Sequence, residues 1–152
     1  MEERIRKALA ARYGTSAAEH AELDNLGGHA SLRIYWRIRM PKAVFERRET
    51  SLIAMVLPQD ASALKSEEGN SSAAPAPEEL AFVSVQRYLH GLGVRVPAID
   101  FVDMDLGVLL LEDLGDTTFE NVYLEHREPE PLYREAIDLL VDYQRRVHLD
   151  SA

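Results

Sequence analysis

The sequence predicts an α+β fold in which a five-stranded, mainly antiparallel sheet carries one packed helix and is followed by C-terminal helices. Residues 32–39 alternate between apolar and polar side chains, which is typical of a half-buried strand. Residues 108–111 form an unbroken apolar run, which is typical of a strand buried on both faces. Helices, hairpins and a single strand then follow one another in an order that predicts an α+β layer.

The chain before the sheet is expected to begin with a helix at Glu2–Tyr13. This segment carries a modest apolar stripe, has acids in its first turn and is followed by Gly14. Thr15–Ala21 shows no pattern that favours one structure. Residues 1–22 are therefore expected to be an N-terminal helix and a connection.

A hairpin is predicted at Leu23–Arg39, with a short strand through Leu26, a glycine-containing turn and a long strand from Leu32. Paired glycines allow positive φ angles, and they let backbone N–H groups approach a ligand closely. The stretch Gly27–Ser31 is therefore either a phosphate-binding loop or an ordinary tight turn. In the long strand, alternation places these apolar residues on one face: Leu32, Ile34, Trp36 and Ile38.

The middle of the chain is expected to supply a third strand, a linker and a helix. Ser51–Leu57 is apolar and is closed by a proline. Residues 59–77 are rich in Ala, Ser, Pro and acids without apolar periodicity, which predicts a mobile linker. Pro77–Leu92 begins with proline and two acids and ends among glycines, as a helix does.

A second hairpin and further helices are predicted in the last third of the chain. Ala98–Asp103 is expected to be a strand with Ile99 and Phe101 on one side. Residues 117–126 suggest a short helix or an irregular segment, and residues 131–147 suggest a long helix with one apolar face.

The polar end of the apolar run 108–111 is the first candidate for a site. We expect Glu112 and Asp113 to leave the sheet, because an acid cannot be buried unpaired at tolerable cost. A buried strand that runs into a short polar segment is a common place for a small-molecule cleft. A buried strand followed by an ordinary turn would explain the same residues.

Composition narrows the classes of partner. The chain has 152 residues and a net charge of −9, which argues against nucleic acid or an anionic membrane as the main partner. It contains no cysteine, so disulfides, thiolate metal sites and a cysteine nucleophile are excluded within it. No apolar run approaches the roughly 18 residues of a membrane span. A reducing cytoplasm fits this composition.

Four motifs together resemble the N-terminal lobe of the aminoglycoside phosphotransferase and choline kinase superfamily: LGGHASLRIYWRI, SLIAMVLP, LHGLGVRVPAI and GVLLLEDLGD. They are most similar to bacterial cell-wall amino-sugar kinases, which phosphorylate the anomeric hydroxyl of N-acetylmuramate and N-acetylglucosamine. The resemblance covers Leu26 to about Gln144, apart from the linker. It implies a protein-kinase-like, nucleotide-binding N-terminal lobe at residues 23–116. Residues 117–152 would then be the helical start of a truncated second lobe.

The resemblance also implies ligands and residue roles. The complete enzyme would bind ATP or GTP with Mg²⁺ and an amino-sugar substrate. The loop over the phosphates would be Gly27–Ser31, the backbone of Glu112–Leu114 would pair with the base edge, and Leu111 would line the purine pocket. Pro77–Leu92 would correspond to the kinase αC helix. The implied nucleotide-binding residues are Gly27, Gly28, His29, Ala30, Ser31, Arg33, Met55, Leu111, Glu112, Asp113 and Leu114.

The chain departs from the kinase pattern at the third strand. Kinases usually place there a lysine that binds the α- and β-phosphates, whereas Met55 stands near that position here. Amino-sugar kinases often have an apolar residue at this point. Arg33 or Arg37 is a candidate for neutralising the phosphates, although both also suit a solvated strand face.

A second departure concerns the catalytic loop. The superfamily carries its base-positioning Asp and its metal-holding Asn and Asp in an HGD-type loop and a following Asp motif. The sequence contains no His-Gly-Asp, and His148–Asp150 is not that motif. We therefore expect no catalytic or metal-binding residue here, and a missing C-terminal lobe or partner chain would supply them. A non-catalytic interaction module and a decayed pseudokinase fragment are the alternatives.

Overall fold

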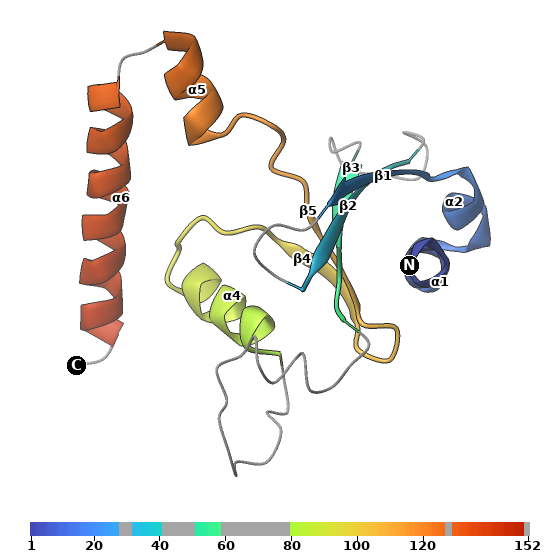
Figure 1. The fold of residues 1–152 in the computed structure, drawn as a ribbon. Helices are drawn as coiled ribbons and strands as arrows, with labels where there is room; N and C mark the ends of the chain where they lie inside the picture. The colour runs from blue at the N-terminus through green and yellow to red at the C-terminus, as the bar shows by residue number, and fades with distance from the viewer. Residues whose placement is uncertain (28–31, 41–50, 59–79, 127–128, 151–152) are drawn as a thin grey trace. The chain divides into compact units, whose positions relative to one another are not determined.

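The computed structural model describes most of the chain, and it forms two compact units (Figure 1). The described residues are 1–27, 32–40, 51–58, 80–126 and 129–150. The first unit comprises residues 1–83 with 97–113, and the second comprises residues 84–96 with 114–152. The predicted linker at 59–77 lies outside the described residues. Each unit is taken by itself below.

The first unit contains a five-stranded sheet in the order β1-β2-β3-β5-β4. All four neighbouring pairs are antiparallel, which confirms the predicted α+β class and sheet. The prediction that the second strand begins at Leu32 is wrong, because that strand begins at Ile34, and Leu32 is 55% exposed. The strands are β1 (Glu22–Gly27), β2 (Ile34–Arg39), β3 (Ser51–Val56), β4 (Ile99–Asp103) and β5 (Val108–Glu112).

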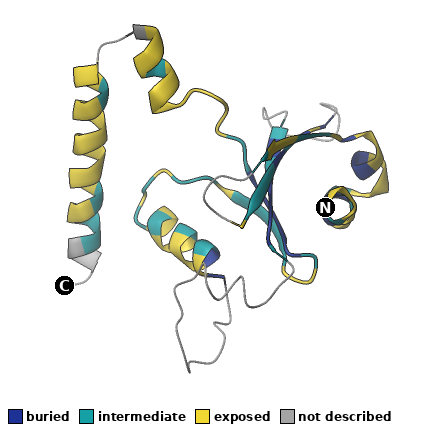
Figure 2. Cartoon of the chain, in the orientation of Figure 1, coloured by how far each residue is buried: buried dark blue, intermediate teal, exposed yellow. Residues whose placement is uncertain are grey.

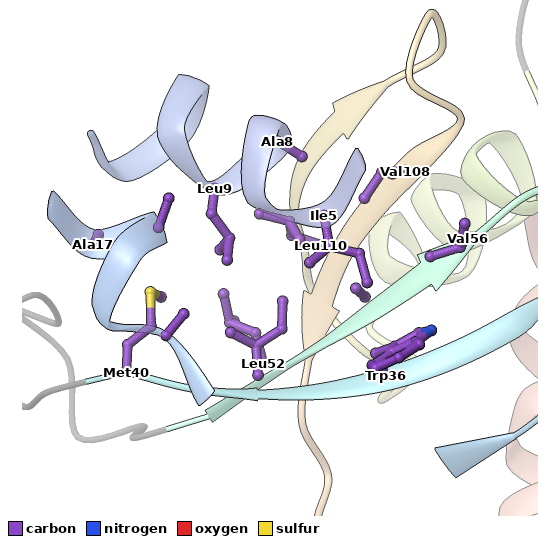
Figure 3. Close-up of a cluster of buried hydrophobic side chains, with 14 residues drawn as sticks. Ile5, Ala8, Leu9, Ala17, Trp36, Met40, Leu52, Val56, Val108 and Leu110 are labelled. Atoms are coloured by element: carbon purple, nitrogen blue, oxygen red, sulfur yellow. The ribbon is translucent and has the colours of Figure 1, made fainter. Parts of the chain in front are cut away.

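Helix α1 (Glu2–Tyr13) packs on one face of the sheet, together with the short helix α2 (Thr15–His20). The spacing of Ile5, Ala8 and Leu9 puts all three on one side of α1, where they are fully buried. Figure 3 shows them directed toward strand residues that include Trp36 and Leu110. We call this side of the sheet the α1 face. The sequence predicted α1 but not that it covers the sheet.

Hydrogen bonds from the Arg4 side chain connect α1 to the turn between β4 and β5. Its Nη2 donates to the carbonyl oxygens of Leu57 and Gly107, at 3.1 Å each. Its Nε donates to the carbonyl oxygen of Leu106. One guanidinium thus satisfies backbone acceptors from two separate segments, which orients the helix on the sheet.

A second polar contact holds the other end of α1. Arg12 forms two hydrogen bonds with the carboxylate of Asp100 on β4, at 3.0 and 3.1 Å, and the Tyr13 hydroxyl donates to the same carboxylate at 2.7 Å. The hydrogen bond to Asp100 raises the pKa of Arg12 above its usual value. Arg12 therefore stays charged throughout the working range of pH.

The opposite side of the sheet, which we call the Met55 face, carries a second apolar cluster. The segment that opens α4 (Ala81–Gly91) packs here through Leu80 and Val83. The predicted start of this helix at residues 77–79 lies outside the described residues. The buried members of the cluster are Met55, Leu57, Leu80, Val83, Leu109 and Leu111.

The prediction that Ile99 and Phe101 share a side of their strand is wrong. Ile99 pairs with Leu111 and Phe101 pairs with Leu110, so two steps along β4 match one step along β5. This is a β-bulge, and the extra residue reverses the side on which the following residues point. Ile99 therefore packs at the Met55 face and Phe101 at the α1 face.

The second unit is helical, with α5 (Phe119–His126), α6 (Pro129–Asp150) and most of α4. The rings of Phe119 and Tyr133 meet edge to face at 5.1 Å, which joins α5 to α6. Arg146 on α6 donates to the carbonyl oxygen of Leu92 at 2.9 Å. Much of α6 is exposed (Figure 2). Among the helices the structure describes, none is long and apolar enough to span a membrane.

Candidate functional site

The candidate site begins at β5, whose side chains are buried on both faces of the sheet as predicted. Val108 and Leu110 lie in the cluster of the α1 face, whereas Leu109 and Leu111 lie in the cluster of the Met55 face. The implied purine-pocket residue, Leu111, is therefore on the same side of the sheet as Met55.

Met55 occupies the centre of that side. It pairs with Tyr35 on β2 and with Leu109 on β5, and its side chain is fully buried. Leu80 and Val83 belong to the same buried cluster. Met55, which the resemblance places near the lysine position of kinases, is thus packed among apolar side chains.

The rim of the Met55 face is apolar and only partly buried. Ile53 and Tyr35 lie at this rim beside the buried cluster, and so do Phe82 and Ile99. Half-buried apolar side chains of this kind are typical of the wall of a small-molecule site.

Arg33 brings a cation to the same side of the sheet. Its guanidinium carbon lies 6.0 Å from the centre of the Phe82 ring, at the outer limit for a cation–π contact. Phe82 itself packs against the Met55 cluster. Of the two arginines considered for the phosphates, Arg33 is the one that is close in sequence to the predicted glycine loop, two residues after Ser31.

Arg37 forms an ion pair with Asp113. Its Nε lies 2.7 Å from one carboxylate oxygen of Asp113 and its Nη2 lies 3.2 Å from the other. The Ser51 hydroxyl donates to the same carboxylate at 2.8 Å. We call these three residues the Asp113 clamp. A bidentate arginine engaged in this way is a structural partner of the acid.

Asp113 follows the last residue of β5, as expected for an acid that leaves the sheet, but its side chain is buried. The exposed fraction is 6% for the Asp113 side chain and 12% for Arg37. The acid is tolerated there because three donors satisfy it, whereas the expectation rested on the cost of an unpaired acid.

Glu112 stays in the sheet, contrary to expectation, as the last residue of β5 opposite Leu52. Its N–H donates to the carbonyl oxygen of Ala98 at 2.8 Å. In return, the Ala98 N–H donates to the Glu112 carboxylate at 2.9 Å. The side chain of Glu112 thus acts as a strand-pairing partner, and its N–H is engaged within the unit.

The predicted glycine loop and Leu114 are the remaining parts of the predicted site. Gly27 ends β1 with a φ of +80°, and its N–H is received by the Asn25 side chain at 2.7 Å. Gly28, His29, Ala30 and Ser31 lie outside the described residues, so the phosphate-loop role stays a prediction. Leu114 is the first residue of the second unit after β5 and is 57% exposed.

The sequence did not reveal the pairing of Arg37 and Ser51 with Asp113. Arg37 was assigned to a polar strand face by alternation, and 76 residues separate it from Asp113. A charged residue flanked by apolar neighbours was the only signal. Within the described ranges, no group of three or more His, Asp or Glu side chains is arranged to hold a metal ion.

Sequence comparisons show that this chain is similar to proteins named as kinases. It is 32% identical over 123 residues to an N-acetylmuramate/N-acetylglucosamine kinase of Caulobacter vibrioides, which covers 78% of this chain. It is 40% identical over 74 residues to a protein of the same name from Pseudomonas aeruginosa, and 36% identical over 74 residues to one from Pseudomonas putida. No protein-family model matches the sequence.

These matches support a relationship to kinases, and they cover only part of each relative. The chain spans 34% of the length of the Caulobacter protein and 22% of each Pseudomonas protein. The observed α+β fold, with its five-stranded antiparallel sheet, is compatible with a kinase-like N-terminal lobe.

Proposed function

We propose that this chain is the nucleotide-binding lobe of an amino-sugar kinase of the aminoglycoside phosphotransferase type. One arrangement carries the proposal: Arg33, Met55 and Leu111 come from three strands or their edges and share one side of the sheet. The names of the similar proteins agree with this reading. The nucleotide would be ATP, or GTP, with Mg²⁺. The sugar would be N-acetylmuramate or N-acetylglucosamine, in the cytoplasm.

The Met55 face offers each part of a nucleotide a different surface. The base would lie against the partly buried apolar rim near Ile53 and Leu111. Its polar edge would meet backbone groups after Glu112, whose own N–H is engaged with Ala98. The phosphates would extend toward Gly27–Ser31, where Arg33 supplies positive charge in place of the absent lysine.

The chemical step would use residues from outside these 152. In phosphoryl transfer, the sugar hydroxyl attacks the γ-phosphorus, an Asp accepts its proton, and the nucleoside diphosphate leaves. Mg²⁺ neutralises the charge that develops on the phosphates. In the proposal, a further lobe or a partner chain supplies that Asp and the metal ligands, and this chain alone has little or no turnover.

Calorimetric titration of the chain with Mg·ATP tests the proposal. Fluorescence of Trp36 is unsuited to it, because Trp36 is 8% exposed and lies on the α1 face, away from Met55. We expect wild type to bind, and Gly27→Val to weaken binding because a side chain there would keep the backbone from the phosphates. Gly28→Val should act in the same direction.

Gly14→Val is the matched control. Gly14 and Gly27 have φ angles of +91° and +80°, and a Cβ added at either would meet nothing within 4 Å. Both substitutions therefore put a β-branched residue at a positive φ without a steric contact to a neighbouring atom. Equal effects on ATP affinity, or no binding by wild type at millimolar nucleotide, would contradict the proposal.

The exposed apolar residues of α6 favour an interaction module as the second candidate function. Large exposed apolar patches are typical of protein interfaces. This candidate predicts concentration-dependent association in analytical ultracentrifugation, with no response to nucleotide and no effect of Gly27→Val. The residues concerned are Tyr133, Ile137, Leu139, Leu140 and Val141.

A further inference from the structure

The Asp113 clamp gathers side chains from three strands or their ends at one point. Arg37 is on β2, Ser51 opens β3, and Asp113 directly follows β5. In the sheet order, β3 separates β2 from β5. Arg37 therefore reaches across β3 to contact Asp113. The register of β3 with β5, in which Leu52 faces Glu112, brings Ser51 beside Asp113.

The clamp satisfies the carboxylate of Asp113. That carboxylate receives two bonds from the Arg37 guanidinium and one from the Ser51 hydroxyl. A carboxylate offers about four acceptor positions, so most of its capacity is used. Asp113 is thus poorly suited to hold a metal ion or a ribose hydroxyl, the roles that an acid beside a nucleotide would otherwise suggest.

Stability alone does not explain an ion pair in this position. Two charges with side-chain exposures of 12% and 6% have lost most of their hydration. A buried ion pair is often no more stabilising than apolar side chains of similar volume. Its distinctive property is direction, because a bidentate arginine holds a carboxylate in one orientation.

We propose that the Asp113 clamp is a positioning site that sets where the backbone after β5 presents its polar groups to the base of the nucleotide. The side chains of Arg37, Ser51 and Asp113 contact neither base nor phosphate in this scheme; they act through the backbone of Glu112–Leu114. This inference rests on the proposed nucleotide-binding function. It gives the Asp113 side chain a role in addition to the backbone contact that the resemblance implied.

The test compares two ligands, Mg·ATP and Mg·tripolyphosphate, which share phosphates but differ in the base. The variant Arg37→Met with Asp113→Leu replaces the clamp by apolar side chains of similar size. We expect its affinity for ATP to fall about tenfold, or ~1.4 kcal/mol. Its affinity for tripolyphosphate should stay unchanged, because the phosphate subsite is not touched. Loss of packing alone would not discriminate between the two ligands.

The chain offers a matched control in a second bidentate pair. Arg12 and Asp100 are bonded at 3.0 and 3.1 Å and lie where α1 meets β4. Arg12→Met with Asp100→Leu should leave both affinities as in wild type. Ser51→Ala, which removes a single hydrogen bond, is the milder variant: it should weaken ATP binding about threefold if the clamp variant does not fold.

Each outcome has a distinct meaning. Wild type that binds neither ligand overturns the proposed function, and the positioning role falls with it. Wild type that binds ATP while the clamp variant and Ser51→Ala bind it equally well overturns the positioning role and leaves the proposed function standing. A parallel loss of ATP and tripolyphosphate affinity also overturns it, because the clamp would then support the whole face.

Discussion

Replacing Arg4 by methionine removes the side chain that fastens α1 to the β4–β5 turn. The carbonyl oxygens of Leu57 and Leu106 would each lose a charged donor. The Gly107 carbonyl loses the same donor but still accepts the Leu57 N–H at 2.9 Å. The cost is therefore dominated by two hydrogen bonds.

The expected loss follows from those two bonds. A hydrogen bond to a charged group contributes about 1.5–3 kcal/mol, and we take the lower value because Arg4 is partly exposed. The free energy of unfolding should fall by about 3 kcal/mol. With a urea dependence of ~1.5 kcal/mol per molar, the midpoint should fall by about 2 M.

Trp36 makes the assay specific to the first unit. It is the only tryptophan in the sequence and belongs to the cluster beneath α1, so its fluorescence reports unfolding of that unit in urea. Lys7→Met is the control on the same helix, because Lys7 is 61% exposed and pairs only with a neighbouring surface acid in the described contacts. If Arg4→Met moves the midpoint no further than Lys7→Met does, the reasoning about Arg4 is refuted.

Two other substitutions test the packing on either side of the sheet. Gly107→Ala should lower the free energy of unfolding by about 2 kcal/mol in the wild-type background. Gly107 has a φ of +59°, and an added Cβ would lie 2.5 Å from Arg4 Nη2. In the Arg4→Met background the same substitution should lower the free energy of unfolding by only ~1 kcal/mol. If urea unfolding gives the same loss in both backgrounds, the predicted clash between the added Cβ and Arg4 is contradicted. Met55→Lys should lower the free energy of unfolding by at least ~3 kcal/mol, because the ammonium would be buried among apolar side chains. For the same reason, the lysine should not improve the affinity for ATP. Met55→Leu should cost less than about 1.5 kcal/mol, and similar thermal midpoints for the two variants would show that the lysine finds water or a partner.

The sequence predicted the strands well where the signal was local. The run 108–111 had to be buried on both faces because it offers no polar side to water, and β5 confirms this. The alternation in β2 likewise separates Trp36 and Ile38 from Tyr35, as the two clusters show. Each of these predictions needed only a few consecutive residues.

Features that depend on distant partners were missed. The burial of Asp113 follows from Arg37, which is 76 residues away, so local reasoning saw only an acid that had to avoid the interior. The bulge in β4 contains no glycine or proline that would indicate it in the sequence. The face of the sheet on which Phe101 lies was therefore predicted by simple alternation. The stripe on α1 predicted a helix, but its length and spacing do not say which surface it covers.

Strand β5 is held at both of its ends by hydrogen bonds from arginines elsewhere in the chain. Arg4 bonds to Gly107, which directly precedes β5, and Arg37 bonds to Asp113, which directly follows it. Strand ends ordinarily fray, and fraying is what lets deuterium reach backbone amides without unfolding of the whole unit. With both ends held, the β5 amides exchange only when the entire sheet opens. Protection should therefore extend evenly along this strand and fall at Leu114, the first residue after it that belongs to the second unit.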